Sequence, residues 1–338
     1  MEHRNRFWRL NSHPLGNDFA SALSLEEGPV PRAADGQVVI AGEYLSLDAG
    51  TRMWMSARTD GYQPPLPLGS QMVGLVLGRI TESRHSSFPV GKLVRAFGQW
   101  ADYSCVEPVA SGLMIVDDTV SDAREHLGSL GLNAWTALIG LTEVAKTRPG
   151  ETVLVSAAAG STGMLAVQIA KIMGCRVIGI AGGAAKCAFL SNELAVDEAI
   201  DYKAPNLESR LAAIPGGIEV YFDNVGGPLL DTVLPYMVHY GRVAISGLIS
   251  GYSTDDPVPL KRFDQVLMRR LTISGVFTPD YVSRAEYYDR VLRRWFDQGR
   301  LRMHFDMTTG LGRMLEAYGK LFTGGNLGKV LLAIDRDA

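Results

Sequence analysis

The 338-residue chain has few cysteines, no large excess of charge of either sign and no long uninterrupted apolar run. Its three cysteines, Cys105, Cys175 and Cys187, form no CxxC pair, which excludes a disulfide framework. The net charge of −3 provides no basic field for nucleic acid or an anionic membrane. The most apolar stretch, residues 152–174, is interrupted by glycines and polar side chains and is too polar to span a bilayer. No apolar segment follows the basic N-terminus, so we expect no signal peptide and a soluble, cytoplasmic protein.

The composition is that of a globular protein, with 46% hydrophobic and 20% charged residues, and the length suits about two domains. The first hundred residues contain short strand-like runs at 37–41, 71–80 and 92–97, separated by turns rich in glycine and proline. This pattern predicts a β-rich domain of irregular or barrel type.

From residue 152 onward, strand-like and helix-like segments alternate. We expect strands at 152–156, 176–181, 198–201, 219–222, 242–245 and 272–277. Helices are expected between most of them, including 164–173 and 185–194. Such alternation predicts a parallel, doubly wound α/β sheet. After the sheet, Ser283 and Glu286 have the spacing of a capping box and predict the start of another helix.

A glycine-rich turn stands directly between the first of these strands and its helix. Residues 157–163 read AAAGSTG and contain Ala159, Gly160, Ser161, Thr162 and Gly163. Gly160 allows the backbone to approach a diphosphate, and Gly163 allows the helix to pack closely on the strand. A tight structural turn is the alternative, but the strand–turn–helix context favours a dinucleotide site.

The residues after the next strand indicate which dinucleotide is bound. An NAD site expects an acidic residue there, whereas this chain reads Ala181, then Gly182, and reaches Lys186 one helical turn later. A lysine without a neighbouring carboxylate favours NADP(H), with Lys186 on the 2′-phosphate. The alternative for Lys186 is a solvated lysine at a helix start.

At these residues the sequence resembles the medium-chain dehydrogenase/reductase superfamily, and in particular its zinc-free branch of alkenal double-bond, prostaglandin and curcumin reductases. The likeness runs through residues 44–52, 131–136, 157–163, 175–186, 222–227, 247–252 and 326–329. It implies a GroES-like catalytic domain at 1–125 and 305–338, a Rossmann NADP-binding domain at 126–304, and a homodimer joined through the edge strand near 272–277.

The resemblance also implies roles for individual residues around the cofactor and the substrate. Tyr252 and Tyr62 match tyrosines of the substrate pocket, and Arg52 is a further candidate whose alternative is an ion pair with Asp48. Besides the glycine turn and Lys186, the implied cofactor contacts are Thr136, Gly182, Tyr202, Asn224, Ser246, Gly247, Phe277 and Asn326.

The chain departs from the family pattern on the substrate side. Gly50 stands where the family has a pocket tyrosine. The family segment Pro-Gly-x-Thr-Ala-Tyr reads NAWTAL at 133–138, so Asn133 replaces the proline and Leu138 replaces the tyrosine. These changes make the substrate the least defined feature.

No metal is expected. Where the zinc enzymes of the superfamily carry Gly-His-Glu, this chain has Gly69, Ser70 and Gln71, and its six histidines are scattered. Without a Lewis acid, hydride transfer to the β-carbon of an α,β-unsaturated aldehyde or ketone is favoured over reduction of a simple carbonyl. The expected function is thus an NADPH-dependent enone or enal reductase with a small apolar substrate. Quinone reduction and a catalytically silent NADP(H)-binding protein are the alternatives.

Overall fold

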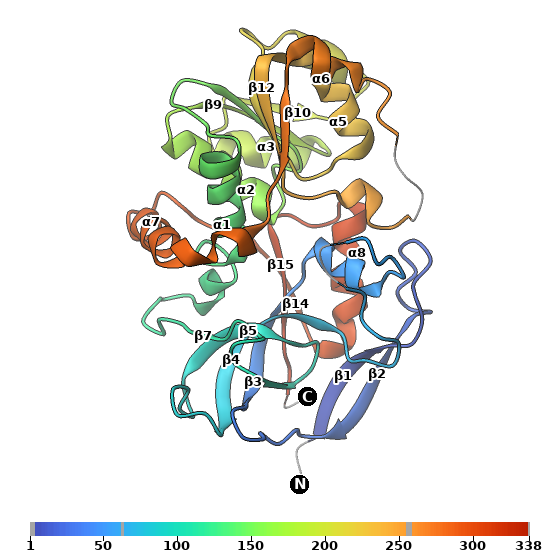
Figure 1. The fold of residues 1–338 in the computed structure, drawn as a ribbon, viewed down its shortest axis with the longest axis vertical. Coiled ribbons are helices and arrows are strands. Elements are labelled where there is room, and N and C mark those ends of the chain that lie inside the picture. Colours follow the sequence, from blue (N-terminus) through green and yellow to red (C-terminus); the bar gives the residue numbers. More distant parts are fainter. Residues whose placement is uncertain (1–3, 62–63, 255–258, 337–338) are drawn as a thin grey trace. The chain divides into compact units, whose positions relative to one another are not determined.

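The computed structural model describes residues 4–61, 64–254 and 259–336. The chain forms two compact units. Unit 1 comprises Met1–Leu127, Tyr252–Thr254 and Phe305–Ala338, and unit 2 comprises Gly128–Gly251 and Asp255–His304. Unit 1 therefore combines the two ends of the chain, drawn in blue and red in Figure 1.

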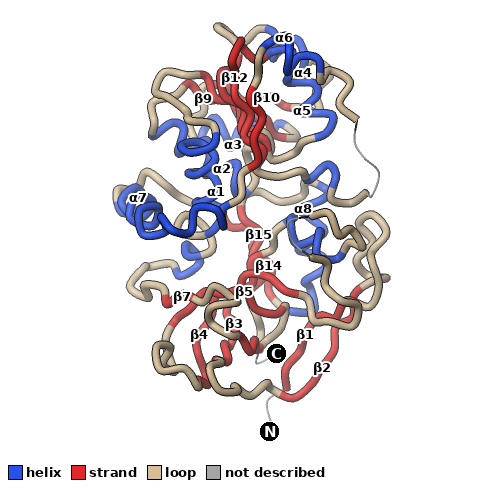
Figure 2. Tube along the Cα trace, viewed as in Figure 1, coloured by secondary structure: helices blue, strands red, loops and turns tan. Residues whose placement is uncertain are grey.

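Unit 2 is built on a six-stranded sheet in the order β10-β9-β8-β11-β12-β13, in which every neighbouring pair is parallel. Figure 2 draws its strands in red, with helices in blue. The strands are β8 (Thr152–Val155), β9 (Arg176–Ala181), β10 (Glu198–Asp201), β11 (Ile218–Asp223), β12 (Met237–Ile245) and β13 (Thr272–Gly275). The strand order reverses between β8 and β11, so the crossovers diverge at their carboxyl ends. That point is where ligands bind in open sheets of this type, and the predicted doubly wound fold is confirmed.

Helices follow most of these strands in sequence. The regular ones are α1 (Leu132–Ile139), α2 (Ser161–Ile172), α3 (Ala184–Glu193), α4 (Leu207–Ala212), α5 (Gly227–Val233), α6 (Asp264–Arg269) and α7 (Ala285–Asp297). A π-turn, η3 (Gly140–Val144), continues α1, and short 3-10 turns are η4 (Leu234–Tyr236), η5 (Ile249–Gly251) and η6 (Thr278–Arg284). α2 is almost entirely buried beyond its first turn, as its apolar residues on all sides predict.

The prediction that Ser283 caps a helix is wrong. α7 begins at Ala285, its N-cap position is Arg284, and no side chain caps its first turn. Ser283 lies inside the preceding 3-10 turn η6, so it lacks the extended backbone of an N-cap residue.

Unit 1 contains a seven-stranded sheet with the order β14-β15-β3-β4-β5-β7, with β6 pairing on β3. Its strands are β3 (Val38–Ser46), β4 (Val73–Ser83), β5 (Leu93–Gln99), β6 (Tyr103–Val106), β7 (Met114–Ile115), β14 (Phe305–Thr309) and β15 (Lys329–Ala333). A separate antiparallel pair consists of β1 (Arg4–Leu10) and β2 (Leu23–Pro29). The β-rich domain is confirmed, although the sequence analysis did not identify β1 and β2.

Helical segments of unit 1 are α8 (Met314–Thr323) and the turns η1 (Ala49–Met55), η2 (Ala123–His126) and η7 (Leu311–Arg313). α8 carries Tyr318, whose fully buried ring lies 4.8 Å from the ring of Phe19 and 5.1 Å from that of Trp100. The Tyr318 hydroxyl lies 2.8 Å from Thr51 Oγ1. This cluster joins the C-terminal helix to η1 and to the barrel core.

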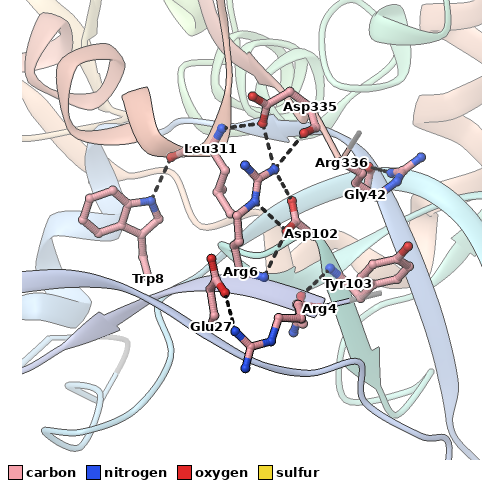
Figure 3. Close-up of polar contacts among 11 residues, drawn as sticks. Arg4, Arg6, Trp8, Glu27, Gly42, Asp102, Tyr103, Leu311, Asp335 and Arg336 are labelled. Atoms are coloured by element: carbon pink, nitrogen blue, oxygen red, sulfur yellow. Dashed lines mark hydrogen bonds and ion pairs between the residues drawn. The ribbon is translucent and has the colours of Figure 1, made fainter. Parts of the chain in front are cut away.

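The two chain ends are tied together inside unit 1 by Arg6 (Figure 3). Its guanidinium donates to both carboxylate oxygens of the buried Asp102, at 2.9 and 3.0 Å, and to Asp335 Oδ1 at 2.9 Å. These acceptors raise the pKa of Arg6, so the guanidinium stays charged. Trp8 Nε1 adds a hydrogen bond to the carbonyl oxygen of Leu311 at 3.0 Å. The first strand and the C-terminal segment therefore stabilise each other.

None of the helices in the described residues combines the length and the apolar character needed to cross a membrane.

Candidate functional site

The glycine-rich turn joins β8 to α2, as predicted. Ala157 has a positive φ of 45°, and Gly160 occupies the N-cap position of α2 without a capping side chain. A Cβ added at Gly163 would lie 2.2 Å from the carbonyl oxygen of Ala157, whereas one added at Gly160 would lie 3.2 Å from it. Gly163 is therefore required for close packing of helix on strand, and Gly160 keeps the approach to the helix end open.

The first turn of α2 fits a diphosphate. Its backbone N–H groups point out of a helix end without a side-chain cap, where the helix dipole favours an anion. The Oγ of Ser161 is buried and has no hydrogen-bond partner among the described residues. A buried hydroxyl of this kind normally has a partner, and a phosphate oxygen at the helix end would supply one.

Gly182 and Tyr202 meet at the carboxyl ends of β9 and β10. A Cβ added at Gly182 would lie 2.8 Å from Cε1 of Tyr202 and 3.0 Å from Cε of Lys203, so the glycine makes room for both side chains. Lys186 lies in the first turn of α3 and is half-buried. The predicted residues Gly182, Lys186 and Tyr202 thus lie at the paired ends of β9 and β10 and in the helix that follows β9.

One part of the sequence argument about this strand end is wrong. A carboxylate does lie on the turn, because Asp201 Oδ1 accepts hydrogen bonds from the backbone N–H groups of Gly183 and Lys203, each at 2.9 Å. These bonds lower the pKa of Asp201, so it is ionised. Asp201 comes from the neighbouring strand β10, so the residues at the end of β9 do not reveal it. Its hydrogen bonds to two amides offset its charge and fix the turn.

A buried polar network joins the carboxyl ends of β8 and β11. Asp223 is 0% exposed and accepts hydrogen bonds from Ser156 Oγ at 2.8 Å and from the Tyr221 hydroxyl at 2.7 Å. The N–H groups of Val225 and Gly226 also donate to its carboxylate, at 2.9 and 3.1 Å. Burial raises the pKa of Asp223 despite these donors. The network fixes the turn between β11 and α5.

Three of the predicted cofactor residues are held by this network. Asn224 donates from its backbone N–H to Ser156 Oγ at 2.9 Å and from its side chain to the Ser156 carbonyl oxygen at 2.7 Å. Ser246 and Gly247 donate through their N–H groups to the carbonyl oxygen of Asp223, at 2.7 and 3.2 Å. Ser156 and Asp223 were not among the predicted residues. A polar residue at the carboxyl end of each buried strand, Ser156 directly after β8 and Asp223 as the last residue of β11, was the signal that could have identified them.

Thr136 and Phe277 lie farther along unit 2. Thr136 is half-buried on α1, and its hydroxyl donates to the carbonyl oxygen of Leu132 at 2.9 Å. Phe277 is half-buried directly before η6. Leu138, which replaces a family tyrosine, is 2% exposed and packs inside the unit.

The remaining predicted residues belong to unit 1. Arg52 is buried, and its guanidinium donates to the carbonyl oxygens of Pro14, at 2.8 Å, and Gly16, at 3.3 Å. Through these bonds Arg52 holds the segment at residues 14–16 in place. The suggested alternative partner, Asp48, accepts from the buried Lys329 at 2.5 Å.

Asn326 and Tyr252 complete the predicted residues that the structure describes. Asn326 is buried and donates to the carbonyl oxygen of Gly328 at 3.0 Å. Tyr252 is half-buried after η5, and the neighbouring Ser253 hydroxyl hydrogen-bonds to Asn17. Tyr62 lies outside the described residues.

Among the residues that the structure describes, no group of three or more His, Cys, Asp or Glu side chains is arranged to hold a metal ion. The three cysteines are thiols, and burial raises the pKa of each, that of Cys175 to about 11. Cys105, Cys175 and Cys187 are therefore poor nucleophiles near neutral pH.

Two family models match the chain. Residues 6–116 match the N-terminal domain of oxidoreductase, and residues 161–296 match the family described as zinc-binding dehydrogenase. The second description names a family and does not assign a metal to this chain.

Named relatives match over almost the whole length. The NADPH-dependent curcumin reductase of Escherichia coli strain K12 is 34% identical over 347 residues, covering 100% of this chain and 99% of that protein. Prostaglandin reductase 1 of Bos taurus is 34% identical and covers 96% and 98%. The crystal structure of CurA from Vibrio vulnificus in complex with NADPH superposes with a TM-score of 0.91, at 33% identity, covering 98% of this chain and 99% of that one. The chain therefore belongs to the medium-chain dehydrogenase/reductase superfamily, in the branch that contains the curcumin and prostaglandin reductases.

Proposed function

We propose that this protein is an NADPH-dependent reductase of the carbon–carbon double bond in α,β-unsaturated aldehydes and ketones. The observation that carries the proposal is the turn at the start of α2. The helix end there has no side-chain cap and the buried Ser161 hydroxyl has no hydrogen-bond partner among the described residues, an arrangement suited to binding an anion. Full-length similarity to an NADPH-dependent curcumin reductase and to a prostaglandin reductase supports it.

The residues of unit 2 would hold NADP(H) along the carboxyl edge of its sheet. Ser161 and the N–H groups of α2 would bind the diphosphate, and Lys186 and Tyr202 would bind the adenosine 2′-phosphate and ribose. Asn224, with its amide nitrogen already bonded to Ser156, keeps its side-chain oxygen for a hydroxyl of the cofactor. When bound, NADPH supplies the hydride.

The chain's own catalytic contribution would come from a neutral hydrogen-bond donor. As the β-carbon of the substrate is reduced, negative charge develops on its carbonyl oxygen. The phenol of Tyr252 would donate to that oxygen, and loss of one such donor in comparable sites lowers the rate on the order of 100-fold. Asn326, in the same unit, would help to orient the cofactor. Tyr62 remains a proposed pocket residue, whereas the carbonyl contacts of Arg52 favour an anchoring role for it.

A panel of acceptors tests this function. Steady-state NADPH oxidation is measured with trans-2-alkenals, aliphatic enones, quinones, saturated aldehydes and ketones. We expect turnover of the enals and enones and none of the saturated compounds. Tyr252→Phe should lower kcat on the order of 100-fold, while Tyr240→Phe, at a tyrosine that is 69% exposed on β12, should leave it unchanged.

Other outcomes of the same panel identify the alternatives. Equal turnover of saturated ketones would reject conjugate reduction. Turnover of quinones alone would favour a quinone reductase, and quenching of protein fluorescence by NADPH without turnover would favour a silent binding protein.

We also propose that the protein is a homodimer. β13 has one neighbour, β12, among the described strands, so its other edge can pair with a second copy. Light scattering after size exclusion would show twice the chain mass, and a monomer would reject the pairing.

A further inference from the structure

Asn133 and Thr162 hydrogen-bond to each other at the adjacent N-terminal ends of two helices. Asn133 is the second residue of α1 and Thr162 is the second residue of α2, and the two helices pack against each other (Figure 1). The side-chain amide Nδ2 of Asn133 donates to Thr162 Oγ1 at 3.0 Å. Both residues belong to unit 2, and Thr162 is part of the glycine-rich turn.

This bond leaves the Thr162 hydroxyl in an unusual state for a helical threonine. Other threonines in helical segments donate their hydroxyl proton to the carbonyl oxygen four residues earlier, as Thr136, Thr142 and Thr232 do at 2.9, 2.8 and 2.8 Å. Thr162 instead accepts a hydrogen bond, and its own proton has no acceptor among the described residues. The reason is its position, since the residue four before it lies in the turn rather than in a helix.

We propose that Asn133 is a positioning residue for the cofactor diphosphate, which it serves by directing the Thr162 hydroxyl proton toward a phosphate oxygen. Because one of its two lone pairs accepts from the Asn133 amide, the Thr162 hydroxyl must direct its proton away from Asn133. The Ser161 Oγ on the same turn is buried and has no hydrogen-bond partner among the described residues, so it is a second hydroxyl without an acceptor. The two adjacent hydroxyls and the N–H groups of α2 then form one set of donors.

The arrangement departs from the family pattern. The resembling family carries proline at the position of Asn133, and proline has no side-chain donor. A donor at residue 133 therefore adds a constraint on the turn that the family pattern does not supply. The proposal rests on the NADP(H) site of the proposed function and adds to it a residue from α1.

Calorimetric titration of the whole protein with NADP⁺ tests the proposal, with adenosine 2′-phosphate as a second ligand that lacks the diphosphate. Thr162→Val and Asn133→Leu should each weaken NADP⁺ binding on the order of 10-fold, because each removes or misdirects one hydrogen bond to a charged group. Affinity for adenosine 2′-phosphate should not change. Thr162→Ser keeps the hydroxyl and should bind NADP⁺ as tightly as the wild type does. Thr232→Val is the matched control, because it removes a hydroxyl from another helix of the same unit.

The double variant distinguishes positioning from an independent contact. If Asn133 acts through Thr162, Asn133→Leu combined with Thr162→Val should bind NADP⁺ no more weakly than Thr162→Val alone. Additive losses, or an unchanged affinity in Thr162→Val, would overturn the proposal. If Asn133→Leu lowers the melting temperature of the ligand-free protein, Asn133→Ser replaces it in the test. The shorter serine side chain would not reach Thr162, so the hydrogen bond is lost without a bulky apolar group. Failure of the wild-type protein to bind NADP⁺ would instead refute the cofactor site as a whole.

Discussion

Ser156 and Asp223 join the carboxyl ends of the two central strands of unit 2 by a hydrogen bond of 2.8 Å, although 67 positions separate them in the sequence. Ser156 follows β8, and Asp223 ends β11. The strand order reverses between these strands, and there the chain must turn away on both sides. The pair holds the two strand ends together, and Asn224 is bonded to Ser156 at this point.

Asp223→Asn should weaken both the fold and the cofactor site. The amide nitrogen would face the Gly226 N–H, which now donates to Asp223 Oδ2 at 3.1 Å, so a donor would meet a donor. We expect a loss of about 2 kcal/mol in the free energy of unfolding and a raised dissociation constant for NADPH. Urea denaturation and fluorescence titration measure the two. Tyr221→Phe, which removes one donor and leaves the turn amides bonded, should cost less.

The deficit of Asp223→Asn should also depend on pH. Burial raises the pKa of Asp223, so the folded wild-type protein holds this proton more tightly than the unfolded chain does. The stability that this group contributes is fully present below its ordinary pKa of 3.8 and is lost as the pH rises through the folded value. Asparagine releases no proton, so the difference between variant and wild type should shrink from pH 4 toward pH 7. A difference that grows over this range would show that the folded pKa is lowered.

The two glycines of the turn should separate stability from binding. Gly163→Ala places a Cβ 2.2 Å from a backbone oxygen, so α2 and the turn must shift apart, and we expect about 3 kcal/mol of destabilisation. Gly160→Ala meets only a 3.2 Å contact at a negative φ of −87°, so the melting temperature should change little. Its methyl group would still obstruct the diphosphate. NADPH affinity should therefore fall in Gly160→Ala without a matching loss of stability, and equal effects of the two variants would contradict this assignment.

Lys186→Ala should alter the choice between the two dinucleotides. If its ammonium contacts the 2′-phosphate, the variant should raise the KM for NADPH on the order of 10-fold and leave that for NADH unchanged. Lys203, whose side chain lies beside Gly182, is the natural comparison. A smaller effect in Lys203→Ala would identify Lys186 as the main contact. An unchanged ratio of the two KM values in Lys186→Ala would assign that lysine to the solvated surface.

Much of unit 2 could be predicted because its signals are local. β9 and β10 begin and end at the predicted residues. After Arg176, β9 is a continuous apolar run, as is typical of a buried parallel strand. β1 was missed for the opposite reason, because its sequence RNRFWRL contains three arginines. Arg6 and Arg9 are stabilised there by acids from distant segments, Asp102 and Glu26, and no local pattern reveals those partners.

The site divides in the same way. The turn at 157–163 could be predicted because its seven residues, together with the adjoining strand and helix, carry the whole motif. Asp201 and Asp223 act through neighbours that only the sheet order brings close, namely Gly183 from the β9 end and Ser156 from the β8 end. Asn133 is a third case, because its partner Thr162 lies on another helix. Local sequence patterns therefore identified the glycine-rich turn and missed Asp201 and Asp223, whereas Asn224, which also acts across elements, was identified from the family resemblance.

The ion pair between Lys329 and Asp48 supplies a final prediction, for unit 1. Lys329 Nζ lies 2.5 Å from Asp48 Oδ1, and its side chain is 0% exposed whereas that of Asp48 is 34% exposed. The pair joins the first residue of β15 to the residue before η1, so it connects the segment of Asn326 to that of Arg52. Removing the carboxylate takes one acceptor away from a fully buried ammonium, whereas removing the ammonium leaves a carboxylate that reaches water.

Asp48→Asn should accordingly lower the free energy of unfolding by about 3 kcal/mol. Lys329→Met should lower it by less. The double variant should cost less than the sum of the two, because methionine fills the buried space without a charge. Urea denaturation of the three variants measures the order. If Lys329→Met proves the costlier change, the ammonium must contribute through contacts beyond Asp48, and the asymmetry of exposure would not govern the pair.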